Sequence, residues 1–140
     1  MNPRPKFARR IFTIAGIYGV VVLLPQYFLE DKLGREFPPP LTHPEHFYGF
    51  IGVALAWQFV FLLIARDVQR YRLLMVPAIL EKLSFGVAVL VLHAQGRVAA
   101  LAAGAGIIDL TWALLFALAF RAVRVPAKGM PTCVLQSPFE

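Results

Sequence analysis

The chain contains a single cysteine, Cys133, in 140 residues. One cysteine excludes an internal disulfide, a CxxC redox pair and a thiolate metal cluster. The sequence also has no HExxH, no glycine-rich phosphate loop and no nucleophile–base pair at a recognised spacing, so no familiar enzyme class has motif support. No cofactor is expected. Any catalysis would depend on ionisable residues inside apolar segments, and whether the protein is an enzyme stays open, with a non-enzymatic protein favoured.

Charged residues are scarce. They make up 16% of the chain, whereas 59% is hydrophobic and the mean hydropathy is +0.66. A soluble domain normally keeps its apolar share near about half, so the expected solvent is the lipid bilayer. The net charge of +6 does not indicate nucleic acid, because the basic residues cluster at the ends of apolar runs rather than along one face.

Four apolar runs cover residues 10–29, 46–65, 73–93 and 98–120. Each has roughly the 20 residues that a helix needs to span the hydrocarbon of a bilayer. Backbone groups in lipid must be satisfied within the segment and four runs cannot close a barrel, so all four are predicted to be helices. The short connections predict an all-α, antiparallel four-helix transmembrane domain over residues 1–124, followed by a flexible cytoplasmic tail over 125–140.

The basic residues predict the orientation of this bundle. Most of them precede the first run, follow the fourth or lie between the second and third; they are Arg4, Lys6, Arg9, Arg10, Arg66, Arg70, Arg72, Arg121, Arg124 and Lys128. The opposite side has only Lys32, Arg35 and Arg97. By the positive-inside rule both termini are cytoplasmic. No small-residue cleavage site follows the first run, so we expect a retained helix and a multi-pass protein of the bacterial inner membrane.

The outer loop, residues 30–44, is predicted to contain a stiff extended piece at its three consecutive prolines, residues 38–40. It ends in Thr42-His43-Pro44-Glu45, which matches a capping box. Thr42 is the expected N-cap residue, and Glu45 is expected to reach back to the free amide. These interactions predict the start of the second transmembrane helix.

His43, Glu45 and His46 stand together at this position. They are not predicted to bind a metal, because the capping box explains Glu45 and no further ligand follows at a motif spacing. His46 is predicted to lie at the mouth of a pocket, because it precedes Trp57 by eleven residues and so occupies the same helical stripe.

Three ionisable residues, Glu81, Lys82 and Asp109, lie inside the apolar runs. A charge in the middle of a bilayer costs about 2.5 to 3.5 kcal/mol even on the lenient insertion scale, so such residues usually face the interior of the bundle. Asp109 is about 18 Å along its helix from Arg97, and Glu81 is about 14 Å from Arg72. The three groups are therefore expected at similar depths.

Other polar and aromatic residues are expected at the same level, and together these residues predict a pocket for a small lipophilic or amphipathic ligand. Its predicted ligand-binding residues are Glu81, Asp109, Lys82, Trp57, Gln58, Trp112, Tyr18 and His46. In the alternative interpretation, Lys82 pairs with Asp109 and the acids only join helices. Two acids and one base, however, leave one carboxyl without a partner.

Small residues crowd the start of the fourth run, from Ala99 to Gly106. Such a surface lets another helix approach closely, so it is expected to be buried in the bundle or in contact with another chain. A homodimer or a larger membrane complex is one expected use of this surface. A purely structural membrane subunit is therefore a further alternative.

The chain has Arg9-Arg10 before the first run, Gly16 and Gly19 within it, and the segment His46-Phe47-Tyr48-Gly49-Phe50 at the start of the second run. Through these patterns, residues 9–121 resemble the DoxX-like group of small bacterial four-helix membrane proteins. The resemblance implies the fold and, because some members are linked to redox or respiratory assemblies, a membrane-complex partner. The chain is also similar to sterol-isomerase-like proteins, which place acidic residues and a tryptophan in a membrane cavity. That likeness implies an enzyme that uses a buried carboxyl as a proton shuttle.

Overall fold

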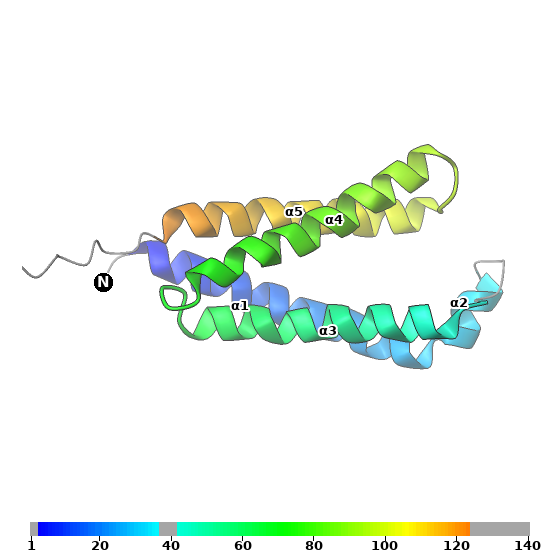
Figure 1. Ribbon diagram of the computed structural model, residues 1–140, viewed down its shortest axis with the longest axis horizontal. Helices are drawn as coiled ribbons and strands as arrows, with labels where there is room; N and C mark the ends of the chain where they lie inside the picture. Colours follow the sequence, from blue (N-terminus) through cyan, green and yellow to red (C-terminus); the bar gives the residue numbers. More distant parts are fainter. Residues whose placement is uncertain (1–2, 37–41, 124–140) are drawn as a thin grey trace, which may run out of the picture.

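The computed structural model describes residues 3–36 and 42–123. Over these residues it contains helices and no strand (Figure 1). The elements are α1 (Pro3–Leu23), the 3-10 helix η1 (Leu24–Phe28), α2 (Glu30–Glu36), α3 (Pro44–Arg66), the 3-10 helix η2 (Arg72–Leu74), α4 (Met75–Ala94) and α5 (Ala100–Ala122). Four segments are long and apolar enough to cross a membrane, which confirms the predicted all-α fold with four spans.

Most of the apolar surface of these four helices is not covered by protein. Only 22 to 28% of the most apolar window of each span is buried. Large apolar side chains outside the interior, such as Phe28 and Leu73, are more than three-quarters exposed, at 84% and 77%. Soluble monomers rarely expose apolar surface on this scale, so the structure supports a multi-pass protein whose outer faces contact lipid.

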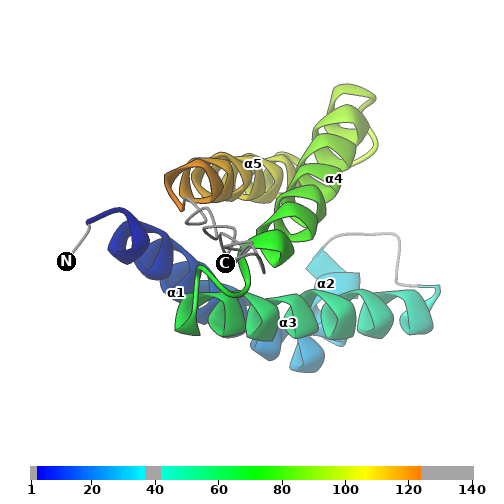
Figure 2. The same cartoon turned by 60° about the vertical axis from the view of Figure 1, so that its left-hand side comes forward.

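The four long helices form two pairs. Helix α1 packs along α3, and α4 packs along α5. The pairs meet where α1 contacts α5, whereas α3 and α4 touch only slightly. Figures 1 and 2 show the pairs close together at the end that holds the start of α1 and diverging toward α2 and the α4–α5 turn.

Glycines allow the helices of each pair to approach closely. A Cβ atom at Gly86 would lie 2.9 Å from the carbonyl oxygen of Gly106, so the backbones of α4 and α5 are nearly in contact. In the other pair, a Cβ at Gly16 would lie 2.7 Å from the side chain of Leu62 on α3. Part of the small-residue face of α5, namely Ala103 and Gly106, is thus buried within the protein.

An aromatic cluster joins the two pairs at their converging end. Phe12 of α1 stacks on Phe116 of α5 with ring centroids 4.3 Å apart, and Phe61 of α3 meets Phe116 edge-on at 4.9 Å. All three side chains are fully buried. They form the centre of the core and separate the diverging part of the bundle from its other end.

Helix α1 and the outer loop differ from the sequence-based expectation. Helix α1 begins at Pro3, seven residues before the predicted start at 10, and gives way to a 3-10 helix at Leu24. The change falls beside Pro25, which has no N–H to continue the α-helical hydrogen bonds. The loop begins with the short helix α2, whose Glu30 and Asp31 in the first turn and Arg35 in the last suit the helix dipole.

The predicted capping box is wrong. The N-cap residue of α3 is His43 rather than Thr42, and it makes no side-chain capping hydrogen bond. Glu45 accepts a hydrogen bond from Nδ1 of His43 at 3.2 Å instead of reaching back to a free amide. Pro44 in the first turn lacks an N–H, which leaves one amide fewer to cap. The three prolines at 38–40 and the tail at 125–140 lie outside the described residues.

Candidate functional site

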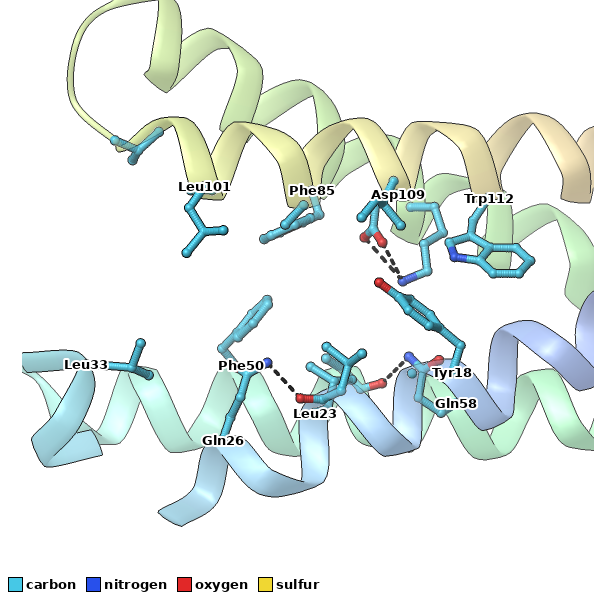
Figure 3. Close-up of a pocket in the computed structure, with 18 of the residues that line it drawn as sticks. Tyr18, Leu23, Gln26, Leu33, Phe50, Gln58, Phe85, Leu101, Asp109 and Trp112 are labelled. Carbon is cyan, nitrogen blue, oxygen red and sulfur yellow. Dashed lines mark hydrogen bonds and ion pairs between the residues drawn. The ribbon is translucent and has the colours of Figure 1, made fainter. Parts of the chain in front are cut away.

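A cavity of about 900 Å³ lies between the two helix pairs, in the part of the bundle where they diverge. Its size falls within the range of about 300 to 1,000 Å³ that is usual for small-molecule sites. Figure 3 shows two facing sets of side chains: Leu101, Phe85, Asp109 and Trp112 on one side, and Leu33, Phe50, Tyr18 and Gln58 on the other. From Leu101 to Trp112, α5 rises about 16 Å, which gives the depth of the cavity.

The floor of the cavity carries three charged side chains. The ammonium of Lys82 donates to both carboxylate oxygens of Asp109 at 3.2 Å, and so links α4 to α5. Its Nζ also lies 3.5 Å from Oε2 of Glu81, which is buried and has no hydrogen bond among the described residues. The side chains of Lys82, Glu81 and Asp109 are only 10%, 18% and 16% exposed.

Aromatic and amide groups surround this floor. Tyr18 of α1 extends toward Asp109 in Figure 3, and its ring centroid is 5.9 Å from that of Trp112. Gln58 is fully buried and donates from Nε2 to the carbonyl oxygen of Ala54 at 2.8 Å. Gly19 makes room for it, since a Cβ there would overlap the Gln58 side chain. Side chains from α1, α3, α4 and α5 therefore meet at one depth.

Six of the eight predicted ligand-binding residues line this cavity; they are Tyr18, Gln58, Glu81, Lys82, Asp109 and Trp112. Trp57 instead packs beside Phe61 at the edge of the core, with ring centroids 6.3 Å apart. Adjacent helical residues point about 100° apart, so Gln58 faces the cavity and Trp57 does not. His46, on the same stripe as Trp57, is exposed and is not part of the cavity lining.

Compared with models of known families, curated proteins and solved structures, the chain matches none of them. The resemblance to DoxX-like proteins stays an expectation. The function therefore has to be argued from the geometry of the site.

Several cavity residues were not predicted from the sequence. Phe50 of α3 and Phe85 of α4 stack across the cavity with ring centroids 5.6 Å apart. Phe85 follows the helical repeat, because it lies four residues after Glu81, and Phe50 is reached from Gln58 in two steps of four residues through Ala54, which also lines the cavity. That spacing was the available signal. Leu33 of α2 was not identifiable, because nothing in the sequence shows that this short helix lies over the cavity.

The first turn of α3 brings His43, Glu45 and His46 together. Their possible metal-ligating atoms all lie within 4.8 Å of one another, and all three residues are exposed. Among the described residues, this is the one group of three side chains of metal-binding type that lie this close together. It lies outside the cavity lining, and the hydrogen bond between His43 and Glu45 accounts for part of the contact.

The cavity combines a charged floor with apolar walls. Leu33, Phe50, Phe85 and Leu101 present carbon atoms above the floor, while Glu36 and Arg97 stand at the mouth. Such a site holds the polar end of a molecule by a few placed groups and its apolar body by contact area. The arrangement suits an amphipathic ligand.

Proposed function

We propose that the protein is an integral membrane protein that binds a small lipophilic or amphipathic molecule in the cavity between its two helix pairs. The observation that carries this proposal is the cavity itself, about 900 Å³, with Glu81, Lys82 and Asp109 at its floor and apolar walls above. If the three charged groups only joined helices, packed side chains and not a cavity would be expected next to them.

The proposal includes an antiparallel bundle with both termini in the cytoplasm of a bacterial cell. Phe12, in the first half of α1, lies beside Phe61 and Phe116, which are late in α3 and α5. Tyr27, just after α1, stacks on Tyr48 near the start of α3. Both contacts support antiparallel neighbours. With the positive-inside rule, the cavity then opens toward the outer side of the membrane.

The other candidate functions have less support. A sterol-isomerase-like enzyme needs a carboxyl that exchanges a proton with its substrate, whereas Lys82 lies within ion-pair distance of both Glu81 and Asp109. A structural subunit would use the small-residue face of α5 for another chain, but Ala103 and Gly106 are already buried within this one.

Native mass spectrometry of the purified protein tests the proposal. We expect the wild type to retain a small molecule that Glu81→Gln and Asp109→Asn release at lower collision energy. Ala102→Trp should abolish retention, because Ala102 lines the cavity and the indole would fill it. Leu114→Trp is the matched control, since Leu114 is 61% exposed on a face outside the cavity lining. No bound molecule in the wild type, or equal retention by all variants, would count against the pocket.

A further inference from the structure

The group formed by His43, Glu45 and His46 in the first turn of α3 has no part in the cavity. The expectation that no metal binds there depended on a capping role for Glu45. In the structure, Glu45 accepts a hydrogen bond from His43 instead, and the N-cap side chain makes no hydrogen bond to the helix. The side chains of this turn contact one another, so the reason for excluding a metal is removed.

The separations within the group suit a metal ion. Nδ1 of His43 and Oε1 of Glu45 are 3.2 Å apart. Two ligand atoms of a tetrahedral zinc ion, each about 2.0 to 2.1 Å from the metal, are separated by roughly 3.3 Å. His43 and Glu45 therefore already have the spacing of two zinc ligands.

His46 supplies the third ligand. It lies three residues after His43 on the same face of the helix, and the two ring centroids are 5.5 Å apart. Its ligating nitrogen is within 4.8 Å of the other two ligand atoms, and all three residues are exposed. Exposed side chains change rotamer freely, so a small torsional change brings the three atoms around one ion.

The ligand types select the metal. Two imidazole nitrogens and one carboxylate oxygen form a ligand set that zinc uses in proteins with a further position open to water. Imidazole also suits copper and nickel, whereas Mg²⁺ and Ca²⁺ prefer oxygen ligands. The positive end of the α3 dipole disfavours a cation, but the Glu45 carboxylate supplies a compensating negative charge in the same turn.

The depth of the group leaves it accessible to ions in water. His46 precedes Gln58 by twelve residues, or about 18 Å along α3. Gln58 lies at the level of the cavity floor, and half the hydrocarbon thickness of a bilayer is only about 15 Å. The group therefore lies at the membrane surface, on the side of the cavity mouth, where the next residue, Phe47, is part of the lining.

From these observations we propose that His43, Glu45 and His46 bind one divalent transition metal ion of the zinc type, with one ligand atom from each residue. The remaining coordination position faces water. This site does not rest on the proposed function, because its three residues lie outside the cavity lining.

Zinc titration tests the site, and the small number of histidines makes the test specific. The chain has three histidines, and the third, His93, is exposed and lies within 3.0 Å of the carbonyl oxygen of Val98 at the end of α4. Tag-free protein carrying Cys133→Ser, which removes the only thiol, is titrated with ZnCl₂ in phosphatidylcholine nanodiscs by calorimetry. We expect one equivalent of Zn²⁺ to bind and MgCl₂ to give no binding heat above that of empty nanodiscs.

Alanine variants assign the ligands. Changes in the second shell of a metal site already cost about 10- to 100-fold in affinity, so His43→Ala and His46→Ala should each weaken Zn²⁺ binding at least about tenfold. His93→Ala is the matched control and should leave the affinity unchanged. Equal affinity in all three variants, or no binding heat in the parent protein, would overturn the metal site and leave the proposed function untouched.

Histidine labelling separates three ligands from two. In protein labelled with ¹⁵N at histidine only, Zn²⁺ should shift the imidazole signals of His43 and His46 and leave those of His93 in place. Glu45→Gln should weaken binding about tenfold, while the same two histidines still shift at saturating Zn²⁺. Unchanged affinity in Glu45→Gln would overturn the three-ligand site, and a shift of His93 alone would overturn the site as a whole.

Discussion

Lys82 holds the floor of the cavity together. Its ammonium is the positive charge beside Asp109, at 3.2 Å, and Glu81, at 3.5 Å, and its side chain is 10% exposed. Lys82→Met keeps much of the side-chain volume and leaves two carboxylates without their counter-charge. Removing one partner of a buried ion pair costs about 3 to 5 kcal/mol. We therefore expect a clear fall in the melting temperature of the variant, measured in detergent by circular dichroism.

Lys32→Met is the matched control for this prediction. Lys32 pairs with Glu36 at 3.8 Å on the surface of α2, where the two side chains are 61% and 55% exposed. Exposed pairs of this kind contribute about 0 to 1 kcal/mol. Adding Asp109→Asn to Lys82→Met should recover part of the lost stability. Equal melting temperatures for the two lysine variants would mean that the floor contacts are not structural.

The residues of the floor were predictable for one physical reason. An ionisable group in an apolar run must face the interior, so Glu81, Lys82 and Asp109 could be placed from the sequence alone. Trp57 could not, because either Trp57 or its neighbour Gln58 could have faced the cavity. Gly19 decides between them, since its missing side chain gives Gln58 the space it occupies. That contact between helices has no signal in a single sequence.

Within the α4–α5 pair, the close approach depends on Gly86. A Cβ at this position would lie 2.7 Å from Cγ of Leu110 and 2.9 Å from the backbone oxygen of Gly106. Gly86→Ala therefore forces the helices apart, and we expect a loss of about 1 to 3 kcal/mol from overpacking, measured by steric-trap unfolding.

Gly104→Ala provides the comparison on the same helix pair. A Cβ at Gly104 would meet no atom within 4 Å, so the substitution meets no steric resistance. It should leave stability unchanged or raise it by up to about 1 kcal/mol, the difference in helix propensity between glycine and alanine. Similar effects of the two substitutions would contradict the tight crossing of α4 and α5.

The elements themselves were predicted with uneven success. Hydropathy marks the part of a helix that lies in lipid, so the long runs that became α3, α4 and α5 were identified within about two residues of their ends. Helix α1 continues through the basic residues before its apolar run, where hydropathy gives no signal. Helix α2 was missed because seven mostly charged residues resemble a loop.

At the scale of the whole molecule, the bundle is two helix pairs that meet at one end rather than four equally packed helices. The sequence predicted that the polar faces of the helices would meet near Glu81, Lys82 and Asp109. It could not show that the α1–α3 and α4–α5 pairs diverge from that level toward α2 and the α4–α5 turn. The divergence depends on where the bulky residues lie: Phe12, Phe61 and Phe116 fill the converging end. In the diverging part, small residues such as Ala54, Ala102 and Ala105 line the space instead.

The sidedness of the cavity leads to a prediction for the intact membrane. In a Cys133→Ser background, single cysteines replace Leu101, at the mouth of the cavity, or Gln69, an exposed residue between α3 and α4. The positive-inside rule puts the segment with Gln69 in the cytoplasm and the mouth on the outer side. A membrane-impermeant maleimide added to right-side-out vesicles should therefore label Leu101→Cys directly and Gln69→Cys only after permeabilisation.

The same two variants distinguish an open mouth from a buried one. Labelling of Gln69→Cys alone in intact vesicles would reverse the topology of the bundle. A cysteine at position 101 that reacts in detergent but not in vesicles would mean that the mouth opens to lipid rather than to water, and the ligand would then enter from within the outer leaflet.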